Sequence, residues 1–526
     1  MDLLIAAAFT LYFLWLVFQA LTYLTNSNTG SKSKDGAAAP TLPPGPKPLP
    51  IIGNLLSLGS LPHRSLSEIS SSYGPIIKVS LGSVTTVIIS SPELAKEIYH
   101  AHDASFPLRY IPDAVTPFDQ DKYALPWMPI SPLWKSLRRV CTQHLFSVRK
   151  LDSTQYLRRT CLEILLEQVT ECCRDGVAVN LGEAAFGTSL NLMTNSMFSI
   201  NASEIGNRGK RGCEGSVKEF KEIVWSILEE AGKPNVSDFF PVLKRFDLQG
   251  ARRRMTRNFG RMLQVIEGLI EKRLDERAKN GEKRENTNSD LLDTLLDICE
   301  EKTEAMQVFH IKHFFLDLFI AGTDTTSSTV EWAMAELLHN PEKLARSQDE
   351  LHRIVGNGKP IEESDFCRLP YLNAIVKETF RLHPAAPLLM PRKCSDDTLI
   401  GGYTVPRDSQ VFVNVWAIGR DKDVWGDDAT EFMPERFLGS SIDLKGQYPE
   451  LSPFGGGRRI CPGLPLAVRM AHLMLGSLLN NFGWKIADGV AAEEMNMDEK
   501  FGITLQKAQP LRAVPLRITE TSGREN

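Results

Sequence analysis

The sequence predicts a mainly helical protein with a small β portion, built as a single large body behind an N-terminal transmembrane helix. Most of the chain after residue 50 repeats apolar residues with the period of an amphipathic helix. Only short stretches alternate apolar and β-branched residues as strands do. Residues 3–24 are almost wholly apolar and uncharged, and crossing a bilayer takes about 20 such residues.

Length and composition set broad limits. Average domain size would divide 526 residues into two or three domains, yet no linker divides the chain after residue 50. With 42% apolar residues, 24% charged residues and a net charge of −4, no basic excess indicates nucleic acid, and we expect no such partner. The nine cysteines are odd in number and scattered, which favours reduced thiols facing the cytosol over a disulfide framework.

The N-terminal region predicts a membrane anchor, a linker and a hinge. Asp2 precedes the apolar run while Lys32 and Lys34 follow it, so the positive-inside rule keeps the remainder of the chain cytosolic. A cleaved signal peptide fits less well, because the run is too long and lacks a basic start; a buried core helix is the third alternative. Residues 25–50 form a flexible linker and a stiff hinge, with five prolines in its last nine residues. A proline-rich ligand for a partner is the rival interpretation of that hinge.

Residues 51–526 predict the globular body. Residues 76–90 read as a β-hairpin around Gly82, and short strands are expected near 399–405 and 410–414. Helical periodicity covers residues 133–147, 155–174, 215–232, 249–276, 308–339, 341–355, 370–382 and 463–482.

One cysteine stands in an unusual setting near the C-terminus, between Phe454 and Gly463. Glycines before it would let backbone approach a flat macrocycle. Pro462 is favoured at a first helical position, which would place the Cys461 sulfur at a helix N-terminus and lower its thiol pKa. Arg459 on the same turn could reach a haem propionate. The pattern indicates a thiolate ligand to haem iron, whereas the alternative is a glycine-rich turn beside a structural cysteine.

The predicted helix 308–339 carries a small, polar patch at residues 321–326. Glycine costs about 1 kcal/mol relative to alanine inside a helix, and threonine hydroxyls can bend one. A groove here would leave room for O₂, with Thr325 supplying a hydroxyl and Asp324 a proton source. The alternative is a kinked helix in which Asp324 forms a structural salt bridge.

Two further pairs share helix faces. Glu378 and Arg381 are three residues apart, and on an exposed helix they would form a minor surface pair. Trp134 and Arg138 are four apart and offer suitable donors to a propionate, although core packing is the default role for the tryptophan.

Together these motifs resemble the cytochrome P-450 superfamily. The haem signature F-x-x-G-x-R-x-C-x-G is matched by Phe454, Gly457, Arg459, Cys461 and Gly463. The oxygen-activation motif, E-x-x-R, P-E-R-F and W-x-x-x-R follow the family order across essentially the whole chain. The resemblance implies the cytochrome P-450 fold for residues 51–526.

The resemblance also implies roles for single residues. Haem b would be bound through Cys461, with Phe454 and Gly463 beside it and its propionates held by Trp134, Arg138, Arg392 and Arg459. Thr325 and Asp324 would deliver protons. Glu378, Arg381 and Arg436 would form a structural triad, and the substrate pocket would include Phe315, Ala321, Thr325 and Leu389.

The implied reaction is RH + O₂ + 2e⁻ + 2H⁺ → ROH + H₂O, with electrons from NADPH through a separate cytochrome P-450 reductase. No dinucleotide-binding fingerprint lies in this chain. We expect a monomer with a single span in the endoplasmic reticulum membrane. Within the family the sequence is similar to the plant microsomal group that includes geraniol 8-hydroxylase, so the expected substrate is a small apolar terpenoid such as a monoterpenol. Diterpenes, phenolic amines and alkaloids are alternative substrates; a haem-thiolate isomerase or dehydratase and a non-enzymatic membrane haem protein are rival classes.

Overall fold

The computed structural model describes residues 41–201, 217–280, 290–301 and 305–518, together with Thr10, Tyr12 and Trp15. Apart from these three positions, the predicted transmembrane segment lies outside the described residues. Within the described ranges, no helix combines the length and the apolarity that a membrane span requires. The chain divides into two units, Met1–Thr41 and Leu42–Asn526, and every named helix and strand belongs to the second.

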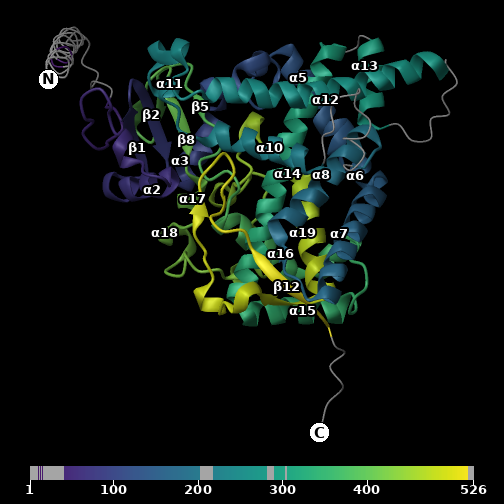
Figure 1. Cartoon of the computed structure of the whole chain (residues 1–526). Coiled ribbons are helices and arrows are strands. Elements are labelled where there is room, and N and C mark those ends of the chain that lie inside the picture. Colours follow the sequence, from purple (N-terminus) through teal and green to yellow (C-terminus); the bar gives the residue numbers. More distant parts are fainter. Residues whose placement is uncertain are drawn as a thin grey trace, which may run out of the picture. The chain divides into compact units, whose positions relative to one another are not determined.

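Helices dominate this second unit, as the sequence predicts (Figure 1). The long helix α14 (Val308–His339) lies at its centre and packs against α8 (Leu181–Phe198), α12 (Ala251–Asn280), α16 (Pro370–Leu382) and α19 (Leu464–Asn481). The other helices are α2 (Pro62–Tyr73), α3 (Pro92–Lys96), α4 (Gln120–Tyr123), α5 (Pro132–Val140), α6 (Val148–Ser153), α7 (Gln155–Asp175), α10 (Val217–Gly232), α11 (Val236–Phe239), α13 (Leu291–Glu301), α15 (Pro341–Ile354), α17 (Val415–Ile418) and α18 (Lys422–Trp425).

The strands form small sheets beside the helices. The predicted hairpin is confirmed as β1 (Ile76–Leu81) and β2 (Val84–Ile89), which pair antiparallel. The hairpin belongs to a five-stranded sheet of order β1-β2-β8-β5-β3, in which β8 (Gln410–Val413) runs parallel to β2. The remaining strands are β3 (Leu108–Arg109), β4 (Val179–Asn180), β5 (Arg392–Lys393), β6 (Thr398–Ile400), β7 (Tyr403–Val405), β9 (Phe482–Ile486), β10 (Glu499–Lys500), β11 (Gln506–Lys507) and β12 (Arg512–Arg517).

The proline hinge packs onto this sheet. The Pro44 carbonyl accepts a hydrogen bond of 2.8 Å from the Lys78 amide. A Cβ added at Gly45 would lie 2.0 Å from the Lys78 carbonyl oxygen, so only glycine permits this approach. The second unit begins at Leu42, where the flexible part of the predicted linker and hinge (residues 25–50) gives way to the proline-rich part.

The structure contains a central helix, α8, that periodicity did not predict. This helix packs against both α7 and α14, and buried residues therefore occur all around it instead of along one stripe. A Cβ added at Gly182 would lie 2.7 Å from the Glu331 carboxylate of α14, so glycine allows the two helices to approach closely. The sequence of α8 lacks the usual alternation of an apolar and a polar helix face, because the helix has no solvent-facing side with a distinct composition.

A buried ionic cluster joins α16 to the irregular segment that follows α17. Arg381 donates to both carboxylate oxygens of Glu378, at 2.6 and 2.7 Å, and Arg436 donates to one of them at 3.0 Å. All three side chains are buried or nearly so. The two guanidinium groups also donate to the backbone carbonyls of Gly419, Trp425, Asp428, Ala429 and Glu431.

Replacing the shared carboxylate should therefore destabilise the fold. Glu378→Gln removes the carboxylate charge that two buried guanidinium groups share, of which only Arg436 keeps another acidic partner among the described residues, Asp428 at 3.5 Å. We expect a loss of about 3 kcal/mol or more in the free energy of unfolding. Urea denaturation followed by circular dichroism measures this loss. Glu229→Gln, which removes the exposed pair with Lys233, is the matched control and should cost less than about 1 kcal/mol. Equal losses in the two variants would contradict the structural role of the cluster.

Candidate active site

A cavity of about 370 Å³ lies against α14, and its wall is mostly apolar. Segments far apart in the sequence meet there, among them α5, α14, α19 and the loops near residues 109–127, 385–392 and 453–463. The predicted site residues that line it are Trp134, Arg138, Ala321, Thr325, Leu389, Arg392, Phe454, Arg459, Cys461 and Gly463.

Two predicted residues are not among those lining the cavity. Phe315 is fully buried and packs edge-to-face on Phe198, with ring centroids 4.9 Å apart. Its neighbour Phe314 lines the cavity instead, because successive helix positions point about 100° apart. Asp324 is 2% exposed and lies away from the cavity, as described below.

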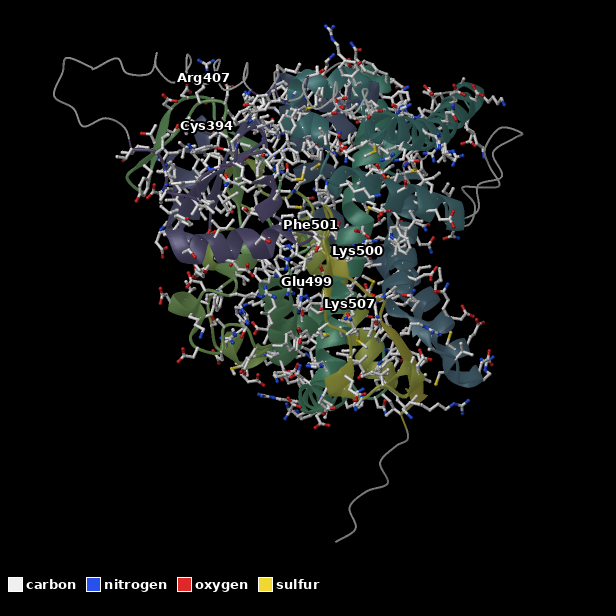
Figure 2. All side chains as sticks on the ribbon, turned by 60° about the vertical axis from the view of Figure 1, so that its left-hand side comes forward. Cys394, Arg407, Glu499, Lys500, Phe501 and Lys507 are labelled. Atoms are coloured by element: carbon white, nitrogen blue, oxygen red, sulfur yellow. The ribbon has the colours of Figure 1, made fainter. Side chains whose placement is uncertain are left out.

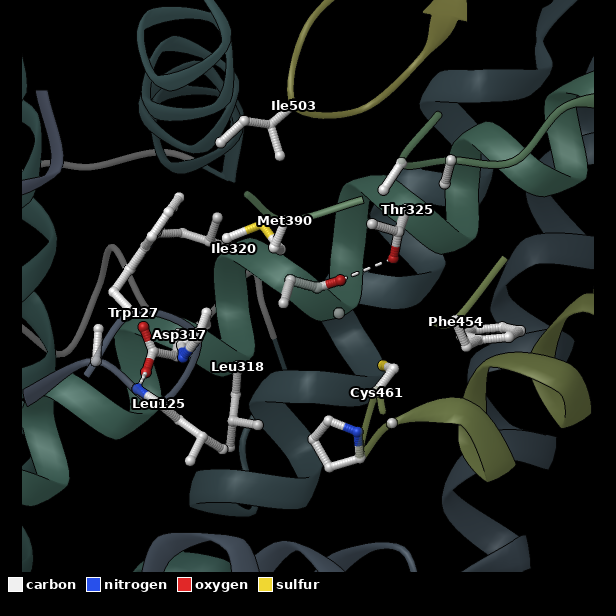
Figure 3. A pocket seen from close by; sticks show the side chains of 18 of the residues that line it. Leu125, Trp127, Asp317, Leu318, Ile320, Thr325, Met390, Phe454, Cys461 and Ile503 are labelled. Carbon is white, nitrogen blue, oxygen red and sulfur yellow. Dashed lines mark hydrogen bonds between the residues drawn. The ribbon is translucent and has the colours of Figure 1, made fainter. Parts of the chain in front are cut away.

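The Cys461 sulfur points into the cavity toward the part of α14 that carries Thr325 (Figure 3). The Cys461 amide donates to the Phe454 carbonyl at 3.1 Å, which closes the loop that presents the sulfur. The helix begins at Leu464, with Gly463 as its N-cap, so the expectation that Pro462 occupies the first helical position is wrong. The sulfur nevertheless lies beside the backbone N–H groups of Gly463 and Leu464.

The expected lowering of the Cys461 thiol pKa is also wrong for the protein alone. Burial raises this pKa, and it outweighs the opposing effects of the Gly463 and Leu464 backbone groups and of the Arg138 charge. A metal cation at the sulfur would reverse the balance, because coordination deprotonates a thiol. The surrounding donors therefore support a thiolate only in combination with a bound cation.

The glycines before Cys461 make close contacts with protein. A Cβ at Gly456 would lie 2.6 Å from the Tyr99 ring, and one at Gly457, whose φ is +66°, would lie 2.5 Å from the Tyr99 carbonyl oxygen. These two glycines thus let the loop pack on the Tyr99 segment, a role that differs from the expected approach to a macrocycle. Gly463 lies beside the Cys461 sulfur, 3.8 Å from an added Cβ.

Four arginines converge on the cavity wall: Arg109, Arg138, Arg392 and Arg459, which we call the cavity arginines. Burial is the main effect lowering the pKa of each guanidinium, and neighbouring arginines lower those of Arg109 and Arg459 further, the latter to about 10. Among the described residues only Asp103, 3.6 Å from Arg392, pairs with any of them. Such an excess of buried positive charge calls for an anion.

The contacts of Arg459 also indicate that an anion belongs at this wall. Arg459 donates to the Pro107 and Met128 carbonyls, while its Nη1 is buried with no hydrogen-bond partner in the described part of the chain. Its guanidinium lies 5.4 Å from the centroid of the Trp134 ring. The two propionates of haem b carry the charge and the acceptors that this wall lacks, so the residues present fit that cofactor.

Arg109 is a site residue that sequence reasoning missed. It donates to the Pro126 and Met390 carbonyls, at 3.1 and 2.8 Å. Its strand β3 pairs with β5 so that Arg109 stands opposite Arg392. No local signal marks the residue, because the pairing joins segments about 280 residues apart in the sequence.

The small-residue patch on α14 faces the cavity without interrupting the helix. Thr325 donates its hydroxyl to the Ala321 carbonyl at 2.7 Å, and both residues line the cavity. A Cβ at Gly322 would lie 3.0 Å from the Met193 sulfur of α8. Helix α14 runs unbroken from Val308 to His339, so the patch leaves a groove and not a break.

The Asp324 side chain is not among the residues lining the cavity and contacts the segment that contains Gln506. Its Oδ1 accepts a hydrogen bond of 2.8 Å from Gln506. Burial raises the pKa of the carboxyl, and the side chains of Thr504 and Gln506 oppose that effect. No direct hydrogen bond joins Asp324 to Thr325 among the described contacts, so a proton path between them would need an intervening water.

The hairpin of β10 and β11 carries Gln506 and is held at both ends. Figure 2 labels Glu499, Lys500, Phe501 and Lys507 of this hairpin, of which Glu499 and Lys507 are buried and Lys500 is exposed. Glu499 accepts from His63 and Trp416, at 2.9 and 2.8 Å. Burial alone would raise its pKa, but the His63 hydrogen bond and charge, the Trp416 hydrogen bond and the Arg420 charge together lower it to about 2. The hairpin loop thereby places Ile503 and Thr504 on the cavity wall, a contribution that sequence reasoning also missed.

A cysteine whose surface is open to an apolar cavity, with arginines and a threonine groove also on the cavity wall, defines the haem-thiolate class of protein. A family model described as cytochrome P-450 matches residues 43–512. Geraniol 8-hydroxylase of Catharanthus roseus is 49% identical over 506 residues, covering 96% of this chain and 98% of that protein. Geraniol 8-hydroxylase of Swertia mussotii is 48% identical, with 95% and 96% covered. Drimenol monooxygenase of Persicaria hydropiper is 46% identical, with 91% and 93% covered.

The chain belongs to the cytochrome P-450 family. It is accordingly a monooxygenase that binds haem through a cysteine thiolate, takes a small-molecule substrate and needs a redox partner.

Replacing the cavity cysteine tests the ligand assignment. Cys461→Ser should lose the thiolate-type absorption of the reduced, CO-bound protein, because a serine hydroxyl does not replace a thiolate ligand. CO difference spectroscopy measures the change. Cys141→Ala is the matched control, because Cys141 also lines the cavity, and this variant should keep the spectrum. A Cys461→Ser protein with an unchanged spectrum would rule out Cys461 as the ligand.

Proposed function

We propose that this protein hydroxylates a terpenoid alcohol of monoterpenol size, as geraniol 8-hydroxylase does, while anchored in the endoplasmic reticulum membrane. The observation that carries the proposal is 49% identity to a geraniol 8-hydroxylase across nearly the whole length of both chains. The mostly apolar wall of the cavity supports it, since a hydrocarbon chain is bound by burial of apolar surface.

Each group of cavity residues has a distinct part in this reaction. When bound, the haem supplies O₂ activation and oxidation of the substrate. Cys461 would hold the iron, and the cavity arginines with Trp134 would hold the propionates. The groove at Ala321 and Thr325 leaves space on α14, and the Thr325 hydroxyl can pass a proton once it turns from the Ala321 carbonyl.

The proposed setting rests on the sequence. Residues 3–24 have the length and apolarity of a single span, and Lys32 and Lys34 after it favour a cytosolic catalytic unit. Electrons would come from NADPH through cytochrome P-450 reductase in the same membrane. We further propose that the protein acts as a monomer.

The Thr325 hydroxyl is open to a direct test. Thr325→Ala should keep the CO spectrum, lower product formation by about tenfold or more, and release the NADPH electrons as hydrogen peroxide. The ratio of product to NADPH consumed measures this coupling. Thr323→Ala is the matched control, because Thr323 is buried on the same helix and bonds the Phe319 carbonyl in the same manner. Coupling that is unaltered in Thr325→Ala would exclude the proposed proton transfer.

The function itself is tested by expressing the chain in microsomes with a reductase and supplying NADPH with a terpenoid panel headed by geraniol. Mass spectrometry identifies the products, and Cys461→Ser provides the blank. Hydroxylated geraniol that is absent from the blank is the expected result. An intact CO spectrum with no product from any terpenol would refute the proposed substrate class and direct the search to phenolic amines and alkaloids.

A further inference from the structure

The cavity wall contains one carboxyl group that the proposed haem site does not use. Asp317 belongs to α14 and is the only carboxylate residue among the described residues that line the cavity. Its Oδ2 accepts a hydrogen bond of 2.7 Å from the Leu125 amide (Figure 3). In the described part of the chain, its other oxygen has no hydrogen-bond or ion-pair partner.

This carboxyl lies in apolar surroundings. Leu125, Trp127, Leu318 and Ile320 line the cavity around it (Figure 3). Burial raises the pKa of Asp317 well above its ordinary value, and the hydrogen bond from Leu125 opposes this only in part. A protonated carboxyl can both donate to and accept from an uncharged hydroxyl group. An uncharged hydroxyl is therefore a suitable partner for this carboxyl.

Several other polar groups of the wall are engaged, although Ser189 Oγ, Thr504 Oγ1 and Gln120 Oε1 have no hydrogen-bond partner in the described part of the chain. Thr325 and Thr326 donate to carbonyls of their own helix, at 2.7 and 3.3 Å. Gln120 is hydrogen-bonded to His313 at 3.0 Å. The cavity arginines suit the anionic groups of the cofactor. Asp317 is therefore the only carboxyl among the described wall groups that could bind a substrate hydroxyl, and Ser189, Thr504 and Gln120 are the competing polar partners.

The position of Asp317 along α14 fits the length of a monoterpenol. Eight residues separate it from Thr325, which corresponds to about 12 Å along a helix axis. Ala321 lies between them on the same side and also lines the cavity. In extended geraniol the hydroxyl oxygen and the C8 carbon are separated by eight bonds, or roughly 10 Å at ordinary bond lengths.

We propose that Asp317 is a specificity-determining residue, whose unpaired carboxyl oxygen hydrogen-bonds the substrate hydroxyl and directs the far end of the terpenol to the Cys461 end of the cavity. This inference rests on the proposed terpenol hydroxylase function. It predicts which end of the molecule is oxidised, because the hydroxyl end is held away from the reacting end.

A purely structural role for Asp317 is the competing interpretation, since it supports the Leu125 loop. The structural role and the substrate contact are separated by testing Asp317 variants with a substrate that has the hydroxyl and with one that lacks it. The haem-loaded full-length protein is titrated with geraniol and with the hydrocarbon in which CH₃ replaces its CH₂OH group, and the spin-state change of the haem spectrum reports Kd. The proteins compared are wild type, Asp317→Ala, Asp317→Asn and the control Ile320→Val, which alters the same wall without changing its polarity.

Asp317→Ala should raise the Kd for geraniol about tenfold, the equivalent of one hydrogen bond, and should change the Kd for the hydrocarbon by less than about twofold. It should also spread hydroxylation over more than one carbon of geraniol. Asp317→Asn keeps an acceptor for Leu125 and one polar group for the substrate, so its effect should be smaller. Ile320→Val should affect both ligands alike.

Equal losses for both ligands in Asp317→Ala, or no loss for either, would overturn the inference. If Asp317→Ala fails to bind haem, the Kd values of Asp317→Asn and of the wild type for the two ligands test the contact instead. An unchanged geraniol-to-hydrocarbon Kd ratio in Asp317→Asn, with no wild-type preference for geraniol, would refute the contact. A wild type that binds neither geraniol nor the hydrocarbon would instead refute the proposed function, and the inference with it; that failure is read from the wild type alone.

Discussion

The structure depends on one buried carboxylate, Glu378, and the two guanidinium groups that share it. The chain between α17 and Cys461 has little regular secondary structure, so its backbone carbonyls lack ladder partners. Arg381 and Arg436 donate to five of those carbonyls. Glu378 pairs with both guanidinium groups and accepts the Met433 amide at 2.7 Å, and Asp428 lies 3.5 Å from Arg436. The irregular segment that leads to the cysteine loop is thus held by α16, a helix that packs directly on α14 and α19. The ionic cluster makes no contact with the cavity, yet it orients the segment that presents the sulfur.

The arginines at the cavity, unlike those of the Glu378 cluster, have few acidic partners. Glu378 compensates its arginines, whereas the cavity arginines have among the described residues only the nearby Asp103. Burial and mutual repulsion act on them together. The protein therefore spends folding energy to keep a positively charged wall, and binding an anionic cofactor recovers it. The Cys461 thiolate likewise depends on the cofactor. Burial raises the pKa of this thiol, so the thiolate needs the cofactor's cation beside it.

Helix α14 supplies Thr325 and Asp317 to the cavity wall. Asp324 is not among the lining residues and accepts a hydrogen bond from Gln506. The β10–β11 hairpin contacts both, because its loop lines the cavity while Gln506 bonds Asp324. Its other end is held by Glu499, whose hydrogen bonds to His63 and Trp416 tie the hairpin to α2 and α17. The cavity wall and the Asp324 carboxyl are therefore linked through one short segment.

Much of this protein follows from local sequence. Helices α14 and α16 begin and end where periodicity predicts, and the hairpin of β1 and β2 lies where alternation predicts, since periodicity records which side of an element is buried. The motif residues likewise carry their chemistry in their spacing. Tertiary structure alone decided the presence of α8, which has no exposed side, and the place of Phe315, one helix position away from the cavity. It also decided the roles of Arg109 and Asp317, because their partners, at Met390 and Leu125, come from remote segments. Local patterns determine which residues can be buried, whereas only the packed chain determines which of them meet.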